Sequence, residues 1–354
     1  MTSRIKFTPR NIMLGLVILA FAAFLINAFL TDPELFIKQV INGLSQGAVY
    51  ALIALGYTMV YGIVELINFA HGDVYMVGAF SGLTILSLMG VTEKSPVSTI
   101  VLGVVLCFII APIVTAVLNM GIERAFYRPL RNAPRLAPLI TAIGVSFVLL
   151  QIGLIWGGLP RDPFIYFAGS GAQPKPFPNL IPNINLLTDV LGLQTTFQIT
   201  AKQVFAIGLA VPLMILLRVF VSRTRLGKAM RATAQNRDAS RLMGINVDFV
   251  IGMTFLIGGA LAGAGGIVGG LYFQNAQWNM GFDAGLKAFT SAVLGGIGNI
   301  TGAMLGGFLI GLISALSDQY FAAQWTRAIV FLILVLILVF RPNGLLGSAV
   351  AQKA

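Results

Sequence analysis

Charged residues are scarce in this sequence. Asp, Glu, Lys and Arg make up 10% of its 354 residues, whereas hydrophobic residues make up 57%. A soluble domain carries charge on about a quarter of its residues, because its whole surface must be wetted. This chain has too little charge for that, so we expect most of its outer surface to face lipid. The scarcity excludes an ordinary soluble enzyme or binding domain.

The charge that is present is mostly positive. There are 23 Lys and Arg against 12 Asp and Glu, which gives a net charge of +11. In a soluble protein this balance would suggest nucleic acid as a partner. Here the basic residues gather in a few loops between apolar runs, which is the distribution that the positive-inside rule produces. We therefore expect membrane lipid, and no nucleic acid, around this chain.

Residues that carry catalytic or metal chemistry are also few. The single cysteine, Cys107, lies within an apolar run, so no intramolecular disulfide can form, and His71 is the only histidine. The sequence contains no G-x-x-x-x-G-K-[ST] loop, no H-E-x-x-H pair and no nucleophile elbow. We expect a chain that is not an enzyme and binds no metal and no cofactor of its own.

Long apolar runs are abundant. A helix needs about 20 apolar residues to cross a hydrocarbon core of about 30 Å. The run at 284–296 is too short, and we predict a re-entrant half-helix there, surrounded by protein or by a water-filled cavity. The predicted fold class is an all-α polytopic membrane protein with eight to ten membrane segments. The predicted spans are 11–31, 39–64, 74–92, 97–119, 137–158, 200–221, 248–273, 301–320 and 326–340.

The charge of the loops predicts their sidedness. The segments 122–135 and 222–247 are strongly basic, so both should be cytoplasmic. The segment 159–199 is long, holds six prolines and few charges, and should lie outside. The N-terminus carries three basic residues before its first apolar run and should also be cytoplasmic. These assignments agree with strict alternation through the seventh span.

The predicted spans lack buried charge, because Glu65, Asp73, Glu93, Glu123 and Lys287 all fall at predicted ends. Ion-driven transporters usually place ionisable residues at membrane depth, although unwound backbone can bind sodium without them. This pattern argues against a secondary transporter or channel, which nevertheless stays open as an alternative class. If the chain pumps, its energy should come from another protein.

The basic segment 225–246 is where such a protein would act. It reads R-L-G-K-A-M-R-A-T-A-Q-N-R-D-A-S-R-L-M-G-I-N, with apolar residues among the arginines and Gly244 placed as a helix C-cap. Asp238, Ala239 and Ser240, three residues before Gly244, resemble the EAA-x-x-x-G loop of ABC importer permeases, with Asp for Glu and Ser for the second Ala. In that family this loop holds a short helix that docks in a groove of the ATPase subunit.

Two further stretches resemble one branch of that family. Residues 42–73 and 285–311 look like the N-terminal and C-terminal signatures of the bacterial branched-chain amino-acid ABC permeases, specifically the H-type subunit. The resemblance implies a permease domain over 38–347, preceded by an extension, 1–37, with an extra span, and followed by a tail, 348–354. The urea and short-amide permeases are the alternative within the family.

The resemblance also implies an assembly. The fold would be a helical bundle like that of the larger class of ABC importer permeases, in the inner (cytoplasmic) membrane of a bacterium. The partners would be a second homologous permease, two cytoplasmic ATPases and an extracytoplasmic substrate-binding protein. ATP and Mg²⁺ would bind to the ATPases, and the substrate would be a branched-chain or other hydrophobic amino acid.

The candidate coupling residues come from the basic loop. Its arginines can pair with acidic rims on an ATPase, and its small residues let a helix seat closely. The alternative is a solvated basic loop without a partner. The candidate ATPase-coupling residues are Arg225, Gly227, Arg231, Asp238, Ala239, Ser240 and Gly244.

The candidate translocation-path residues are Tyr57, Tyr61, Asn68 and His71. The two tyrosines lie one turn apart and could present hydroxyls to a pathway, or could be packing residues. Asn68 could bond backbone groups freed where the helix breaks. His71 could gate transport by pH, but we favour a turn-capping imidazole beside Asp73 at the membrane edge.

Overall fold

The computed structural model describes residues 9–66, 68–131, 133–134, 136–158, 171–190, 192 and 197–347. These residues are almost entirely helical. The α-helices are α1 (Pro9–Thr31), α2 (Pro33–Val64), α3 (His71–Leu88), α4 (Val97–Ile122), α5 (Leu136–Gly158), α6 (Ala201–Arg223), α7 (Arg225–Gln235), α8 (Arg237–Leu242), α9 (Val247–Phe273), α10 (Met280–Gly295), α11 (Ile300–Ser317) and α12 (Ala323–Phe340).

Short elements complete the described part of the chain. Single turns of π-helix or 3₁₀-helix follow α4 and α11 and interrupt the segment before α6. Two-residue strands pair antiparallel, with Lys175 opposite Ala276. These elements are η1 (Glu123–Tyr127), η2 (Arg128–Leu130), β1 (Lys175–Pro176), η3 (Leu186–Val190), β2 (Asn275–Ala276) and η4 (Asp318–Ala322).

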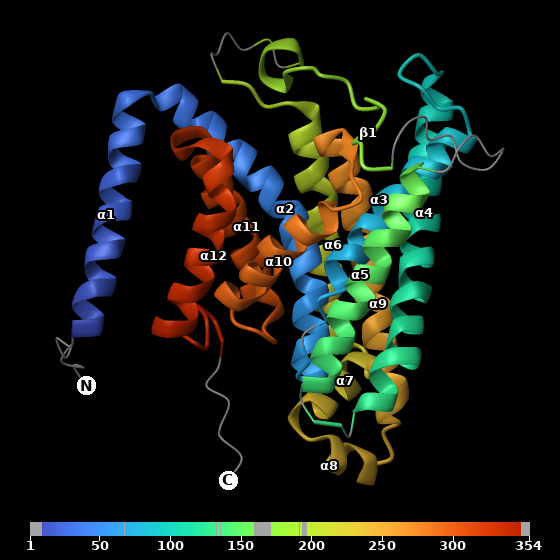
Figure 1. The fold of residues 1–354 in the computed structure, drawn as a ribbon. Coiled ribbons are helices and arrows are strands. Elements are labelled where there is room, and N and C mark those ends of the chain that lie inside the picture. Colours follow the sequence, from blue (N-terminus) through green and yellow to red (C-terminus); the bar gives the residue numbers. More distant parts are fainter. Residues whose placement is uncertain are drawn as a thin grey trace.

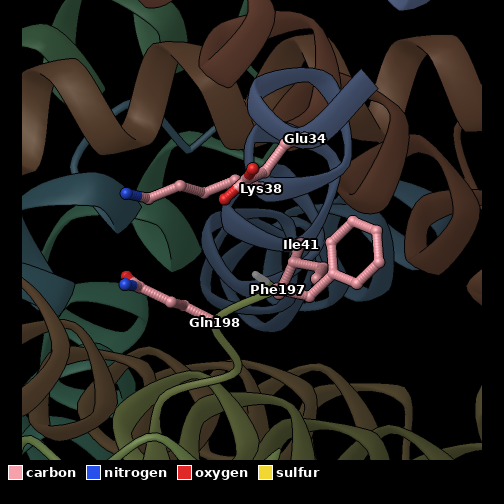
Figure 2. Close-up of a pocket in the computed structure, with 5 residues that line it drawn as sticks. All are labelled: Glu34, Lys38, Ile41, Phe197 and Gln198. Carbon is pink, nitrogen blue, oxygen red and sulfur yellow. The ribbon is translucent and has the colours of Figure 1, made fainter. Parts of the chain in front are cut away.

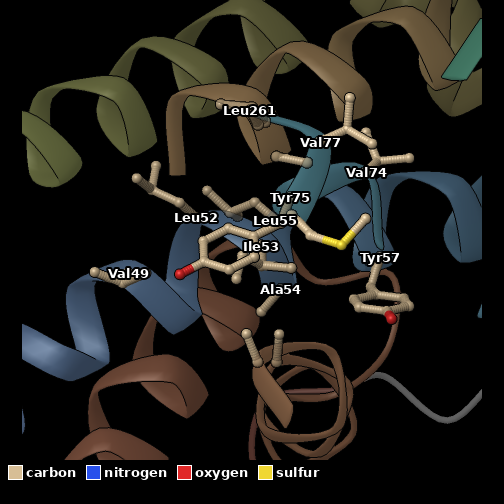
Figure 3. Close-up of a cluster of buried hydrophobic side chains, with 14 of the residues drawn as sticks. Val49, Leu52, Ile53, Ala54, Leu55, Tyr57, Val74, Tyr75, Val77 and Leu261 are labelled. Atoms are coloured by element: carbon tan, nitrogen blue, oxygen red, sulfur yellow. The ribbon is translucent and has the colours of Figure 1, made fainter. Parts of the chain in front are cut away.

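The helices α2 and α9 form the centre of the bundle. Within their most apolar windows, 89% of α2 and 78% of α9 is buried inside the protein, against 22% of α5 and of α6. Figure 3 shows how α3 meets this centre: Val74 and Tyr75 of α3 lie among Leu52, Ile53 and other side chains of α2. The outer helices leave most of their apolar surface for lipid.

Small residues allow the central helices to approach closely. A Cβ added to Gly43 would lie 2.6 Å from the Cα of Leu312 on α11, and one added to Gly78 of α3 would lie 2.6 Å from the Cα of Gly263 on α9. Because lipid provides no hydrophobic force between helices, this backbone proximity supplies much of the packing energy.

The first helix stands apart from the main bundle (Figure 1). Its contact with the rest runs through aromatic rings, since the Phe24 ring lies 5.3 Å from that of Phe321 and 5.5 Å from that of Tyr320. At its end, Asp32 accepts a hydrogen bond from the backbone N–H of Leu35 at 2.9 Å and so caps α2.

The two basic segments lie at one end of the molecule, as their charge predicts. Figure 1 shows α7, α8 and the connection between α4 and α5 at this end, with the described part of 171–200 at the opposite end. The part of the predicted external segment that covers 159–170 lies outside the described residues.

Six helical stretches of the described chain are long and apolar enough to cross a membrane. The predicted number of membrane segments, eight to ten, is higher than this count of six. Three differences account for this: α1 contributes only a shorter apolar helix, Leu19–Thr31, α3 is not counted, and α11 and α12 lie in one stretch, Ile300–Phe340. The six stretches are Pro33–Val64, Val97–Leu130, Leu136–Trp156, Ala201–Arg223, Val247–Phe273 and Ile300–Phe340.

Replacing Gly47 with Ala should destabilise the bundle. The new Cβ would lie 2.7 Å from the Cα of Phe308 on α11, where backbone cannot move aside cheaply, so we expect a loss of about 1–3 kcal/mol. The matched control is Gly208→Ala in α6, because nothing lies within 4 Å of a Cβ there. Thermal unfolding in detergent would compare the two, and equal melting temperatures would contradict the packing described here.

Candidate functional site

The helix α3 begins well inside the bundle. His71, its first residue, lies against Gly56 of α2 and near Gly258 of α9. Gly56 is eight residues before Val64 and Gly258 is eleven after Val247 (64 − 56 and 258 − 247), which places His71 about 12 and 16 Å from those helix ends at 1.5 Å per residue. His71 therefore lies about two to three helical turns inside the ends of these two helices.

The imidazole of His71 is fully buried and makes no hydrogen bond to any described residue. The backbone carbonyl of Ile53 lies near the ring. The imidazole ring of His71 packs edge-on against the ring of Tyr57, with 4.9 Å between the two centroids. The interpretation as a turn cap is wrong, because the imidazole lies against α2, where it fills the space that Gly56 leaves by having no side chain.

The carboxylate of Asp73 is buried in the same first turn. Its Oδ2 accepts a hydrogen bond from the hydroxyl of Ser146 on α5 at 2.5 Å, while Oδ1 has no partner among the described residues. A Cβ on Gly281 of α10 would lie 2.7 Å from Oδ1, so only a glycine there leaves room for the carboxylate.

Charged side chains are therefore buried within the protein, which the apolar runs did not reveal. Besides Asp73, Glu123 is buried and pairs with Arg131, and Lys287 in the middle of α10 donates to the hydroxyl of Tyr50 at 3.1 Å. Hydropathy failed here because it finds where an apolar run begins and not how deep its first turn lies.

A hydrogen-bond network holds the segment between α2 and α3. The hydroxyl of Tyr127 donates to Asn68 Oδ1 at 2.9 Å, and the Asn68 amide donates to Asn119 Oδ1 at 3.3 Å. Asn119 in turn donates to the backbone carbonyl of Phe255 on α9 at 2.6 Å. Asn68 therefore bonds side chains rather than freed backbone, and it ties this segment to α4, η1 and α9.

Tyr57 joins the buried cluster and Tyr61 does not. The ring of Tyr57 lies 6.0 Å from that of Phe289 on α10, which lies 6.2 Å from that of Phe69. A Cβ on Gly285 would lie 3.1 Å from the Tyr57 hydroxyl. Tyr61 is partly exposed, and its backbone carbonyl accepts from Glu65 N at 2.8 Å. Of the four candidate path residues, the structure thus brings Tyr57 and His71 into contact. Asn68 lies three residues before His71 in the sequence and bonds Tyr127 and Asn119 instead.

The second candidate site is the α7–α8 segment, and local capping explains its shape. The Thr224 hydroxyl accepts from the Gly227 N–H at 3.0 Å and starts α7. The Asn236 side chain accepts from the N–H groups of Asp238 and Ala239, each at 3.0 Å, and starts α8. Gly244 has a φ of +78°, which ends the helix as its sequence position predicts.

The predicted coupling residues divide into exposed and structural groups. Arg225, Arg231, Asp238 and Ala239 are exposed, and Arg231 donates to the Ser222 carbonyl at 3.2 Å. The other residues are structural: Ser240 is buried and donates to the Asn236 carbonyl, and Gly227 packs against the backbone of Val221 and Phe220 at the end of α6.

The exposed surface of α8 is apolar at its end. Leu242 and Met243 are 88% and 82% exposed, although the sequence places both in the apolar pattern of the loop. Beside them lies an open hollow of about 350 Å³, lined by Arg241 and by 244–248. Two large apolar side chains projecting from a short capped helix are a surface suited to contact with a protein.

A much smaller hollow lies near the start of α2, at the other end of the molecule (Figure 2). Its volume is about 50 Å³, and Glu34, Lys38 and Ile41 of α2 and two residues before α6 line it. It is too small for an amino acid. Within the described ranges, no group of three or more His, Cys, Asp or Glu residues could hold a metal ion.

The apolar helices and the polar groups buried between them define a multi-pass membrane protein. A family model described as the branched-chain amino acid transport system permease component matches residues 39–339. The chain belongs to this family of transport permease components. The resemblance read from 42–73, 238–244 and 285–311 is thereby confirmed.

Individual relatives agree over most of the chain. The high-affinity branched-chain amino acid transport system permease protein BraD of Pseudomonas aeruginosa is 40% identical over 91% of this chain and 99% of its own length. The corresponding protein LivH of Escherichia coli is 38% identical over 90% of this chain and 97% of its own length. A solved structure, PsaBC from Streptococcus pneumoniae with a Fab, matches with 10% identity and a TM-score of 0.42, too low to support an argument.

The Ser146–Asp73 bond can be tested by a double-mutant cycle. Ser146→Ala leaves both oxygens of a buried carboxylate without a partner, so we expect a loss of about 1–3 kcal/mol. In an Asp73→Asn background the same change should cost less, since the amide carries no charge, with a coupling energy of about 0.5–3 kcal/mol. Unfolding in detergent measures each arm, and strictly additive losses would contradict the bond.

Proposed function

We propose that this chain is the membrane permease subunit of an ATP-driven ABC importer for branched-chain or other hydrophobic amino acids. The observation that carries the proposal is the 40% identity to BraD, which extends over 91% of this chain and 99% of that protein. Similarity over whole lengths supports a shared overall task, because it covers both the buried site and the loop that would receive energy.

The translocation path runs past Tyr57, Asn68 and His71, with Tyr61 at its edge. The buried groups around the start of α3 support this assignment: the His71 ring has no hydrogen-bond partner and Asp73 has one free oxygen within the described chain. Unsatisfied polar groups are rare in protein interiors, and those that persist mark sites that another species or state satisfies. Apolar and small neighbours suit a zwitterion with an aliphatic side chain.

Energy enters through the α7–α8 segment. We assign Arg225, Gly227, Arg231 and the segment 238–244 to ATPase coupling; Arg225 and Arg231 meet the partner's surface, and Gly227 holds α7 against α6. Closure of the ATPases on ATP would pull α8 and shift the bundle between outward-open and inward-open states. ATP and Mg²⁺ stay on the ATPases.

The assembly and the topology belong to the same proposal. The partners are a second homologous permease, two cytoplasmic ATPases and an external binding protein that makes the first selection of substrate. The N-terminus and the end with α7 and α8 face the cytoplasm in a bacterial inner membrane, with eight to ten membrane segments. The helix α10 is about 24 Å long at 1.5 Å per residue, which supports a half-helix.

Changing the exposed end of α8 should uncouple or detach the ATPase. Met243→Asp places a charge on the apolar surface, and Gly244→Val forces a β-branched residue to a φ of +78°. We expect uptake to fall about tenfold or more in both variants, with membrane insertion intact. Gly121→Ala, where nothing lies within 4 Å of the Cβ, is the control. Normal uptake by both α8 variants would exclude α8 as the coupling element.

Transport should require ATP and the binding protein. Proteoliposomes containing the whole complex should accumulate labelled leucine only with ATP inside the ATPase-facing compartment and the binding protein on the other side. Omitting either component should reduce uptake to background. Accumulation by this chain alone, driven by a sodium or proton gradient, would instead place it among secondary transporters.

A further inference from the structure

Arg237, the first residue of α8, reaches across to the end of α2. Its Nη2 donates to the backbone carbonyl of Val64 at 2.5 Å and to that of Ile63 at 3.1 Å. Among the described residues, these are the only side-chain hydrogen bonds that link α8 to a membrane helix. The other side-chain bonds of α8, such as Arg241 to Asp238, stay within the segment.

The carbonyls that Arg237 binds are the last ones of α2. A helix leaves its final four carbonyls without intrahelical partners, and the negative end of its dipole favours a cation there. Glu65, the next residue, has a φ of +57°, so the backbone turns sharply away from the helix axis. Arg237 therefore binds α2 at the point where its helical hydrogen bonding stops.

Beyond this turn, the chain leads back into the bundle. Within six residues of Glu65 it passes Asn68, which bonds Tyr127 and Asn119, and reaches His71 beside Gly56. A displacement of the end of α2 must therefore move either this segment or its hydrogen bonds. No comparable side-chain link connects the other end of α8 to this segment within the described chain.

Arg237 is held in place at its own end as well. Asn236, directly before it, caps α8 through the N–H groups of Asp238 and Ala239. The Arg237 side chain is partly buried, so the surrounding protein restricts its motion. A single nitrogen, Nη2, binds both carbonyls, and the positive charge of the guanidinium strengthens these hydrogen bonds.

The charge around Arg237 is mixed. Burial lowers the pKa of the guanidinium, and the positive charges of Arg131 and Arg241 lower it further, while Glu65 and Asp238 oppose these effects. Arginine stays protonated in proteins because its ordinary pKa is so high. The link to α2 is therefore present across the physiological pH range.

We propose that Arg237 is a positioning residue that transmits movement of α8 to the end of α2 and so to residues 65–71 of the translocation path. This inference rests on the proposed role of α8 in ATPase coupling. It assigns a specific route to that coupling: α8 pulls two backbone carbonyls, the turn at Glu65 shifts, and the hydrogen bonds of Asn68 rearrange.

The test compares three variants of the whole complex in proteoliposomes. Arg237→Ala removes both bonds, Arg237→Lys keeps the charge on a shorter side chain that lacks the guanidinium, and Arg223→Ala removes an exposed arginine at the end of α6 as a matched control. The readouts are labelled-leucine uptake, ATP hydrolysis and co-purification of the ATPases. The informative quantity is uptake per ATP hydrolysed, which a merely structural residue would not change in the surviving complexes.

We expect Arg237→Ala to lower uptake per ATP by about tenfold, while the ATPases still co-purify and hydrolyse ATP. Arg237→Lys should fall between this variant and the wild type, and Arg223→Ala should match the wild type. Unchanged uptake per ATP in Arg237→Ala would overturn the inference, and so would loss of the ATPases, because Arg237 would then belong to the docking surface. If the wild-type complex shows no ATP-dependent uptake, the proposed function itself fails.

Hydrogen–deuterium exchange gives a second measurement that does not depend on the alanine variant folding. In the wild-type complex, a non-hydrolysable ATP analogue should change exchange at 65–71. In Arg237→Lys the same analogue should change exchange at this segment less than in the wild type, while altering α8 to the same extent. An equal response of 65–71 in both proteins would show that movement reaches the segment by another route.

Discussion

Every polar group that this bundle buries must find its partner inside the protein, because lipid offers none. The network from Tyr127 through Asn68 and Asn119 to the Phe255 carbonyl meets this requirement for the segment between α2 and α3. Arg237 meets it for the end of α2. Both ring nitrogens of His71 and one oxygen of Asp73, at the first turn of α3, are among the buried polar atoms of the described chain that have no such partner.

Close approach of backbone makes this arrangement possible. Gly72 of α3 meets Gly281 and Gly285 of α10, so that a Cβ on Gly72 would lie 2.9 Å from the Cα of Gly285. The short helix α10 can therefore lie directly over the start of α3 and cover Asp73. The same residues that permit tight packing also leave little side-chain bulk to resist a shift between α3 and α10.

Hydropathy predicted the helices well and their depth poorly. The ranges 97–119 and 248–273 agree with α4 and α9 to within three residues, because a long apolar run leaves few alternatives in a membrane. The run at 74–92 missed the first turn of α3, since residues 71–73 are polar or small and give no apolar signal. The only available sign was the order of His71, Gly72 and Asp73 directly before that run.

The sequence motif predicted the coupling segment. It did not predict the hydrogen bonds by which Arg237 links this segment to the end of α2. The cap at Gly244 depends on local backbone, which a sequence pattern records. The Arg237–Val64 bond joins residues 173 positions apart and depends on where the end of α2 lies, which no local pattern records. The partners of Asn68, Asn119 and Asp73 were missed for the same reason.

The fit of His71 into the space beside Gly56 has a consequence for how this sequence can change. Any side chain at position 56 would overlap the imidazole, so the two positions can change only together or in a fixed order. The ring must first be replaced by something smaller before position 56 can accept even a methyl group. The pair therefore imposes an order on substitutions, because the space left by glycine fixes the size of its neighbour.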